Sequence, residues 1–290
     1  TKYAEQGFFG SQFYLGRIYE VGSGVLKNEK TAVSWYGKAA RQGFDPALIN
    51  LEKMAEQGNV FAQKGLADLY HNGSGVTQNL KTALKWYTKA AEQGFSAAQI
   101  DLASILIYSG NTQAGLKWMT KAAELGDSEA SRKLGRWHYE ESDKTCLNLP
   151  FGIKDKDYYP NNKIAFKWYK LSAEQGDRLS EIVVACMYLN GIGVLENHRK
   201  SFDWFTKGAK QGDHYSAYAI SSLGTMYSNG KGVRKDYVRA YMWFNIGAYL
   251  ERKGRGKNDE KKKIIAKEMT TDQILQAQEM SSRCMESDYT

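Results

Sequence analysis

The sequence predicts an all-α solenoid, a stack of helical hairpins, and three observations support this fold class. The phrase AEQG, or a close variant, recurs along the chain. Apolar residues between the recurrences follow helical spacing. The 290 residues are 42% hydrophobic and include only three prolines, which argues against a β-sandwich or a disordered chain. A fixed period of this kind overrides the domain count that length alone would suggest.

The recurring phrase divides residues 1–251 into an array of seven repeats. It ends at Gly7, Gly43, Gly58, Gly94, Gly126, Gly176 and Gly212, giving successive intervals of 36, 15, 36, 32, 50 and 36 residues. The predicted repeats are therefore about 8–43, 44–58, 59–94, 95–126, 127–176, 177–212 and 216–251. We interpret residues 1–7 as the last turn of a helix, and the chain as a fragment of a longer protein.

The repeat at residues 59–94, NVFAQKGLADLYHNGSGVTQNLKTALKWYTKAAEQG, shows how each hairpin is built. Its apolar residues fall at helical spacing in two groups: Ala62, Leu66, Leu69 and Tyr70, then Ala83, Trp86, Tyr87 and Ala90. Between the two predicted helices, Gly73 and Gly75 can adopt the positive φ of a tight turn. Asn79 is placed to cap the second helix, as are Asn28, Asn197 and Asp236 in their repeats.

Glycines and alanines in the repeat also predict how the helices pack. We expect Gly65, with Gly16, Gly135 and Gly224, to let two helix backbones approach closely, at a cost of about 1 kcal/mol in helix propensity. In the closing AEQG, small alanines face the core, Glu and Gln face water, and Gly ends the helix in a left-handed cap.

Three repeats depart from the pattern. Residues 44–58 should form one continuous helix, Pro46 to Gln57, with Ala47, Leu48, Leu51 and Ala55 on its buried face. A single helix delivers the chain to the opposite side, so we expect a break in the superhelix near Gly58, between residues 1–43 and the later array. Residues 95–126 lose the GxGV loop, and residues 127–176 gain an inserted loop at 141–162.

Residues 252–290 differ in composition from the array. Residues 252–267 hold eight basic and two acidic residues, a net charge of +6 out of the chain's +8. We interpret this run as a solvated basic linker. Thr270 and Gln273 then form a capping box that opens a last helix, suited to covering the final repeat.

These motifs resemble the Sel1-like repeat, a relative of the tetratricopeptide repeat, over roughly the first 250 residues. The pattern A-x-x-x-L-G-x-x-Y-x-x-G-x-G-V, then a cap and K-A-x-x-W-Y-x-K-A-A-E-Q-G, is filled almost completely in residues 59–94. The segments AYMWFNIGAYL and KEMTTDQILQAQEMSSRC are similar to the end of bacterial Sel1-like proteins. The resemblance implies a bacterial interaction scaffold, and it leaves open whether the protein is periplasmic, secreted or cytoplasmic.

Candidate partner-binding residues follow from the repeat register. First helices line the concave side of such a stack, so residues between their core positions should project into a groove. The candidate residues are Arg17, Lys64, Asp68, His71, Arg132, Arg136 and Tyr139, with Phe151, Tyr158 and Tyr159 in the 141–162 loop. The same register places Phe13, Glu20, Ile100, Ser104, Ile182, Cys186, Ser221 and Thr225 in the groove. Basic side chains in this set favour an acidic or mixed-charge partner.

Residues for catalysis, metals or cofactors do not form known motifs. The four histidines lie in separate repeats without metal-binding spacing, and the three cysteines have no CxxC spacing. Tryptophans recur at one repeat position, which predicts core packing rather than nucleic-acid stacking: Trp35, Trp86, Trp118, Trp168, Trp204 and Trp243. The sequence thus predicts no cofactor, no metal, no nucleic-acid partner and no membrane span.

Three functional hypotheses remain. The first is a non-catalytic adaptor that binds a partner protein through the groove and the 141–162 loop. The second, implied by the resemblance, is an immunity protein that neutralises a secreted bacterial toxin or effector. The third is a weak cell-wall or β-lactam-directed enzyme, although that branch of the family carries paired cysteines that this chain lacks. The oligomeric state is not predicted.

Overall fold

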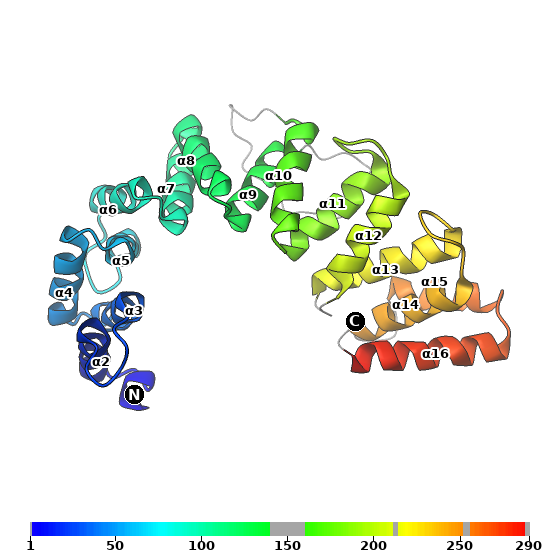
Figure 1. Cartoon of the computed structure of the whole chain (residues 1–290), viewed down its shortest axis with the longest axis horizontal. Coiled ribbons are helices and arrows are strands. Elements are labelled where there is room, and N and C mark those ends of the chain that lie inside the picture. The colour runs from blue at the N-terminus through cyan, green and yellow to red at the C-terminus, as the bar shows by residue number, and fades with distance from the viewer. Residues whose placement is uncertain (1, 140–159, 211–213, 252–255, 288–290) are drawn as a thin grey trace. The chain divides into compact units, whose positions relative to one another are not determined.

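The structure is a computed structural model that describes residues 2–139, 160–210, 214–251 and 256–287. Within these residues the secondary structure is entirely helical (Figure 1). The first eight helices are α1 (Lys2–Glu5), α2 (Phe9–Val21), α3 (Glu29–Ala40), α4 (Asp45–Glu56), α5 (Val60–Asn72), α6 (Leu80–Glu92), α7 (Ser96–Tyr108) and α8 (Thr112–Glu124). The others are α9 (Ser128–His138), α10 (Asn162–Glu174), α11 (Arg178–Asn190), α12 (His198–Ala209), α13 (His214–Asn229), α14 (Tyr237–Leu250), α15 (Lys257–Ala266) and α16 (Thr271–Glu286).

The chain divides into two compact bodies. The N-terminal body, Thr1–Asp127, holds α1 to α8, and the C-terminal body, Ser128–Thr290, holds α9 to α16. Within each body, neighbouring helices pack as hairpins: α2 with α3, α5 with α6 and α7 with α8, then α9 with α10, α11 with α12 and α13 with α14. The all-α hairpin architecture predicted from the sequence is therefore confirmed.

The predicted helix caps and positive-φ glycines of the hairpins are also present. Asn28, Asn79, Asn197 and Asp236 each accept a hydrogen bond from a backbone N–H in the first turn of the second helix, at 2.9 to 3.0 Å. Gly73 and Gly75 adopt positive φ, as does Gly94 at the end of AEQG. Side-chain caps and left-handed glycines thus satisfy helix ends that would otherwise leave polar groups unpaired.

The short repeat is a single helix, α4, as predicted. Ala47, Leu51 and Ala55 are buried as expected, Leu48 is half-buried, and Met54 is buried as well. This single helix reverses the direction of the following helices compared with an array made of hairpins alone. The side-chain amide of Asn59, at the start of α5, lies 2.6 Å from the carboxylate of Glu29, at the start of α3, so α3 and α5 run in the same direction.

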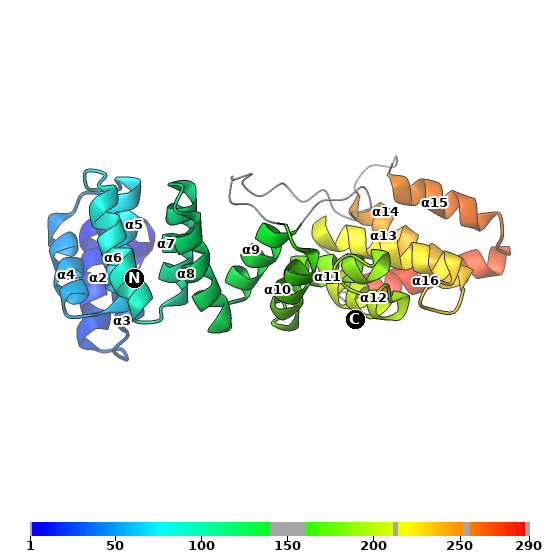
Figure 2. The ribbon, with the colours of Figure 1, turned by 90° about the horizontal axis from the view of Figure 1, so that it is seen from above.

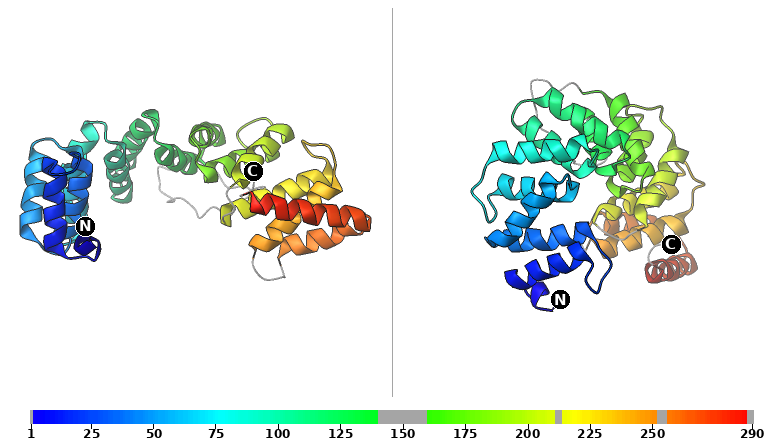
Figure 3. Two further views of the ribbon diagram at one scale, coloured as in Figure 1. Left: turned by 60° about the horizontal axis from the view of Figure 1, so that its bottom comes forward. Right: turned by 60° about the vertical axis from the view of Figure 1, so that its left-hand side comes forward.

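The core continues through α4 without interruption. One buried cluster extends from Ala32 in α3 to Leu102 in α7 and includes Leu51. Helices of this body lie side by side in both views of Figure 3 (blue to cyan). The predicted reversal at the short repeat is real, and the packed core continues across it, because α3 packs against both α4 and α5.

Buried glutamines connect successive repeats, a feature that the sequence reasoning missed. The side-chain amides of Gln12, Gln63 and Gln99 donate to the carbonyls of Ala4, Ala55 and Ala91, at 2.9 to 3.1 Å. Each acceptor is the alanine of an AEQG phrase in the preceding repeat. In the short repeat, the carbonyl of Ala55 anchors α5 through this hydrogen bond.

Glycines at the helix crossings match the prediction at three positions of four. A Cβ atom built at Gly16, Gly135 or Gly224 would lie 2.6 to 2.8 Å from the aromatic ring of the paired helix. At Gly65 the nearest atom belongs to Val33, at 3.5 Å, an ordinary contact. Gly65 lies two residues before the crossing position, which Ala67 occupies in that repeat, so its assignment from the sequence is wrong.

The C-terminal segment folds onto the last repeat. Helix α14 packs against both α15 and α16 (Figure 2). The capping box of Thr270 and Gln273 is present at the start of α16, and Ala277 and Ser281 bury its inner face. Residues 257–266 form helix α15 with Asn258 and Ile265 buried, so this part of the basic run is packed structure and not the solvated linker that its charge predicted.

Candidate partner-binding site

Three charged side chains form a cluster on the first helices of the N-terminal body. The ammonium of Lys64 on α5 lies 2.9 and 3.0 Å from the two carboxylate oxygens of Asp68 and 3.0 Å from the carboxylate of Asp101 on α7. Partial burial alone would lower the pKa of Lys64, but the two carboxylates outweigh it and raise that pKa. With two carboxylates around one ammonium, the cluster carries a net charge of −1, so the basic character predicted for Lys64 is cancelled.

Tyr87 on α6 holds this cluster in place. Its hydroxyl donates to Asp68 at 2.7 Å, and burial, followed by the charge and hydrogen bond of Asp68, raises the pKa of Tyr87 well above its ordinary value. The His71 ring packs edge-to-face on Tyr87, with ring centroids 6.3 Å apart. The predicted residues Lys64, Asp68 and His71 therefore lie together, oriented by a tyrosine from the second helix.

A pocket of about 470 Å³ opens beside the cluster. Its lining comes from three helices: His71, Leu80, Tyr87, Asp101, Ser104, Ile105, Tyr108 and Ser109. Leu80 is 46% exposed and Tyr108 is 78% exposed, so large apolar side chains stand at the mouth. Of this lining, the sequence-based groove included His71 and Ser104; the charge of Asp101 and the two exposed apolar residues were missed.

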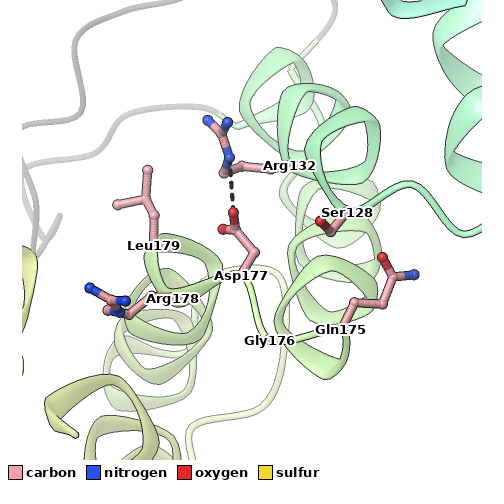
Figure 4. Close-up of a pocket in the computed structure, with 7 residues that line it drawn as sticks. All are labelled: Ser128, Arg132, Gln175, Gly176, Asp177, Arg178 and Leu179. Atoms are coloured by element: carbon pink, nitrogen blue, oxygen red, sulfur yellow. Dashed lines mark ion pairs between the residues drawn. The ribbon is translucent and has the colours of Figure 1, made fainter. Parts of the chain in front are cut away.

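The C-terminal body contains a second candidate area on α9. The guanidinium Nε of Arg132 lies 3.2 Å from the carboxylate of Asp177, which also caps α11 through the N–H of Ser180 at 2.8 Å. Figure 4 shows Arg132 reaching across to Asp177 at the rim of a pocket of about 500 Å³ that Arg178 and Leu179 also line. Arg132 is thus already paired with a carboxylate at this surface.

Arg136 on α9 and Tyr139, the residue after the end of α9, continue the same surface. Both are half-buried, and the ring of Tyr139 lies edge-to-face on Tyr169 of α10, 6.1 Å between centroids. Burial raises the pKa of Tyr169, against the opposing positive charges of Arg136 and Arg132. The structure therefore brings Arg132, Arg136 and Tyr139 together around one buried tyrosine.

The remaining predicted residues fall elsewhere. Arg17 is exposed on α2, in a different hairpin from Lys64. Phe151, Tyr158 and Tyr159 lie outside the described residues. Ile100, Ile182 and Cys186, expected in the groove, are buried, because apolar side chains at these positions pack between helices. Ser221 and Thr225 are covered by Lys261 of α15, whose ammonium lies 3.0 and 3.3 Å from their hydroxyls.

The described residues show neither a candidate metal centre nor a membrane-spanning helix. They contain no group of three or more His, Cys, Asp or Glu side chains able to hold a metal ion. Among the described helices, none combines the length and apolar character needed to cross a membrane.

Comparison with known proteins gives a family match. The family model of the Sel1 repeat matches residues 10–44, 60–95, 96–127, 153–177, 179–213 and 217–251, more than half of the chain. The solved structure of a Sel1 repeat protein from Oxalobacter formigenes is 25% identical and covers 87% of this chain and 88% of that one, with a TM-score of 0.46. The matched segments bracket α4, which lies outside them.

Two curated relatives are similar over shorter stretches. An exopolysaccharide production negative regulator of Rhizobium meliloti is 28% identical over 144 residues, covering 38% of this chain and 54% of the relative. Chitin synthase regulatory factor 3 of Schizosaccharomyces pombe is 27% identical over 135 residues, covering 38% of this chain and 14% of the relative. The chain therefore spans about half the length of one relative and far less of the other.

Proposed function

The chain belongs to the Sel1 repeat family, and from that premise we propose that it is a non-catalytic scaffold that holds a partner protein against the first helices of its repeats. Stacked helical repeats bury their own cores and present extended surfaces to partners. The observation that carries the proposal is the surface of α5 and α7 in the N-terminal body. There, Lys64, Asp68 and Asp101 remain partly exposed beside an open pocket of about 470 Å³.

A second contact area on α9 supports the same proposal. Arg132, Arg136 and Tyr139 are residue types that dominate many protein interfaces, because arginine forms bidentate hydrogen bonds and tyrosine offers rigid apolar area. We propose that the 141–162 loop extends this area. The two surfaces differ in charge, with arginines on α9 and a net negative cluster on α5 and α7, so each should favour a partner segment of the opposite charge.

Affinity capture with the full chain from its source cells, followed by mass spectrometry and titration of the purified partner, tests the proposal. We expect saturable binding that weakens at least tenfold for the double variant Arg132→Glu and Arg136→Glu. The double variant Arg199→Glu and Arg239→Glu, on two exposed arginines of the same body, makes the same charge change and is the matched control. Because Arg132 supports the cap at Asp177, Arg136→Ala and Tyr139→Ala serve as milder variants, with circular dichroism to verify folding.

Each alternative outcome has a distinct meaning. If no captured protein binds saturably, the scaffold proposal fails. Binding that is unchanged by every α9 variant removes this surface from the site. Stoichiometric inhibition of a captured secreted toxin would make the chain an immunity protein, which narrows the scaffold proposal to one partner. Turnover of a β-lactam or a cell-wall fragment by the purified chain would contradict the non-catalytic assignment.

A further inference from the structure

The missing GxGV loop of residues 95–126 leaves uncovered a surface that this loop protects in two repeats of the C-terminal body. In the C-terminal body, the second glycine of the loop packs against the first residue of the second helix of the preceding repeat. A Cβ atom built at Gly193 would lie 2.0 Å from the carbonyl oxygen of Asn162, and one built at Gly232 would lie 2.2 Å from that of His198. Asn162 and His198 are the first residues of α10 and α12, so the loop covers these helix starts closely.

The equivalent helix start in the N-terminal body is Leu80, the first residue of α6. The following repeat connects α7 to α8 through residues 109–111 alone, which do not supply a GxGV segment to cover it. Leu80 and Tyr108 consequently stay exposed, and the pocket described above opens between them. We call this pocket the notch. Its lining includes His71, Leu80, Asp101, Ser104, Ile105 and Tyr108.

The charge of the notch is set by its acidic edge. Asp101 lines the notch and is 39% exposed. It shares the single ammonium of Lys64 with Asp68, so one negative charge is not balanced within the cluster. Next to it stand the apolar side chains of Leu80, Ile105 and Tyr108. A ligand that fits this surface carries a positive group and an apolar group near each other.

The last repeat shows that the first-helix surface of this chain accepts a lysine from another helix. Lys261 of α15 places its ammonium 3.0 Å from the hydroxyl of Ser221 and 3.3 Å from that of Thr225, 5.4 Å from the centroid of the Phe244 ring. In the repeat register, these three positions correspond to Lys64, Asp68 and Tyr87. At that place the first helix holds a lysine from another helix through two hydroxyl groups. The notch offers a carboxylate, that of Asp101, to such a cation.

We propose that the notch binds a segment of the partner protein that places a lysine or arginine beside Asp101 and a neighbouring apolar side chain against Leu80, Ile105 and Tyr108. This inference rests on the proposed scaffold function and specifies the partner chemistry at one site. The cation would satisfy the unbalanced carboxylate through a charge-assisted hydrogen bond. The apolar side chain would cover the surface that the missing loop leaves open.

Selection from a random library of displayed nine-residue peptides on the full chain tests the proposal. We expect enriched peptides to carry Lys or Arg close to an aliphatic or aromatic residue. As synthetic peptides they should bind at least tenfold more weakly to Asp101→Lys and to Tyr108→Ala. Glu124→Lys, which makes the same charge change on an exposed residue of α8, should leave binding unchanged. Changing the peptide's basic residue to Glu should restore binding to Asp101→Lys.

The outcomes separate the notch from the scaffold function. The notch proposal is overturned if no peptide is enriched, or if enriched peptides bind Asp101→Lys and Tyr108→Ala as tightly as the unaltered chain. Should Asp101→Lys fail to fold by circular dichroism, Asp101→Asn and Leu80→Glu provide the same comparison. If a captured natural partner binds every notch variant with unchanged affinity, the scaffold function stands and the notch proposal is refuted. Peptide binding at the notch without any natural partner supports the notch and removes the scaffold function.

Discussion

Leu51 on α4 tests whether the short repeat is part of the N-terminal core. Its side chain is 0% exposed within the cluster that runs from α3 to α7, whereas Ile49 on the same helix is 60% exposed. Leu51→Ala removes a buried side chain and leaves a cavity, a change that costs about 2–5 kcal/mol in well-packed cores. We expect a loss near the middle of that range, about 3 kcal/mol, and about 0.5 kcal/mol or less for the matched control Ile49→Ala.

Urea unfolding followed by circular dichroism measures the loss in the free energy of unfolding. Native-state amide hydrogen exchange then shows which helices are destabilised. Because α4 packs against both α3 and α5, Leu51→Ala should speed exchange in all three helices together. A loss similar to that of Ile49→Ala, or faster exchange confined to α4, would refute the idea that one core passes through the short repeat.

Four other substitutions follow from the described packing and charges. Gly135→Ala should cost about 1–3 kcal/mol, since its Cβ would lie 2.8 Å from an aromatic ring, whereas Gly65→Ala should be neutral or stabilise by up to about 1 kcal/mol; equal urea midpoints would contradict this. Gln63→Ala removes the hydrogen bond from Gln63 to the carbonyl of Ala55, which keeps its bond from the N–H of Gly58, and also the bond that Gln63 accepts from Gln93. It should cost about 1–2 kcal/mol, measured the same way, and a loss below about 0.5 kcal/mol would argue against the anchor. The raised pKa of Lys64 stabilises the fold fully below the unfolded lysine pKa of about 10.4, and this contribution is lost as pH rises through the folded value. Lys64→Met should remove that alkaline loss of Tm above about pH 10, and an unchanged profile would show that Lys64 does not contribute it.

The sequence predicted most of the fold because its signals are local. Caps such as Asn79, positive-φ glycines such as Gly73 and the single helix at residues 44–58 depend on a few neighbouring residues. Packing between repeats was predicted less well. The reversal at α4 was foreseen, but the core that continues through Leu51 requires knowing that α3 contacts α5. The high charge of residues 257–266 suggested a linker, yet these residues form a packed helix. Its packing depends on the burial of Asn258 and Ile265.

Individual residues of the candidate site were predicted from the sequence, but the net charge of the site was not. Lys64, Asp68 and His71 do lie together, yet the carboxylate of Asp101 from the next repeat reverses the expected charge. Trp35 and Trp118, expected in the core, are half-buried beneath the ammonium groups of lysines three residues later. The loss of the GxGV loop was visible in the sequence; that it uncovers Leu80 follows from the contact that Gly193 makes in another repeat.

Amide hydrogen exchange of the full chain, with and without its captured partner, shows which helices the partner covers. We expect slower exchange on binding in the last turns of α5 and α7 and in the first turn of α6, around Leu80. Protection confined to other helices, or no protection by a partner that binds saturably, would contradict the assignment of this surface as the binding site.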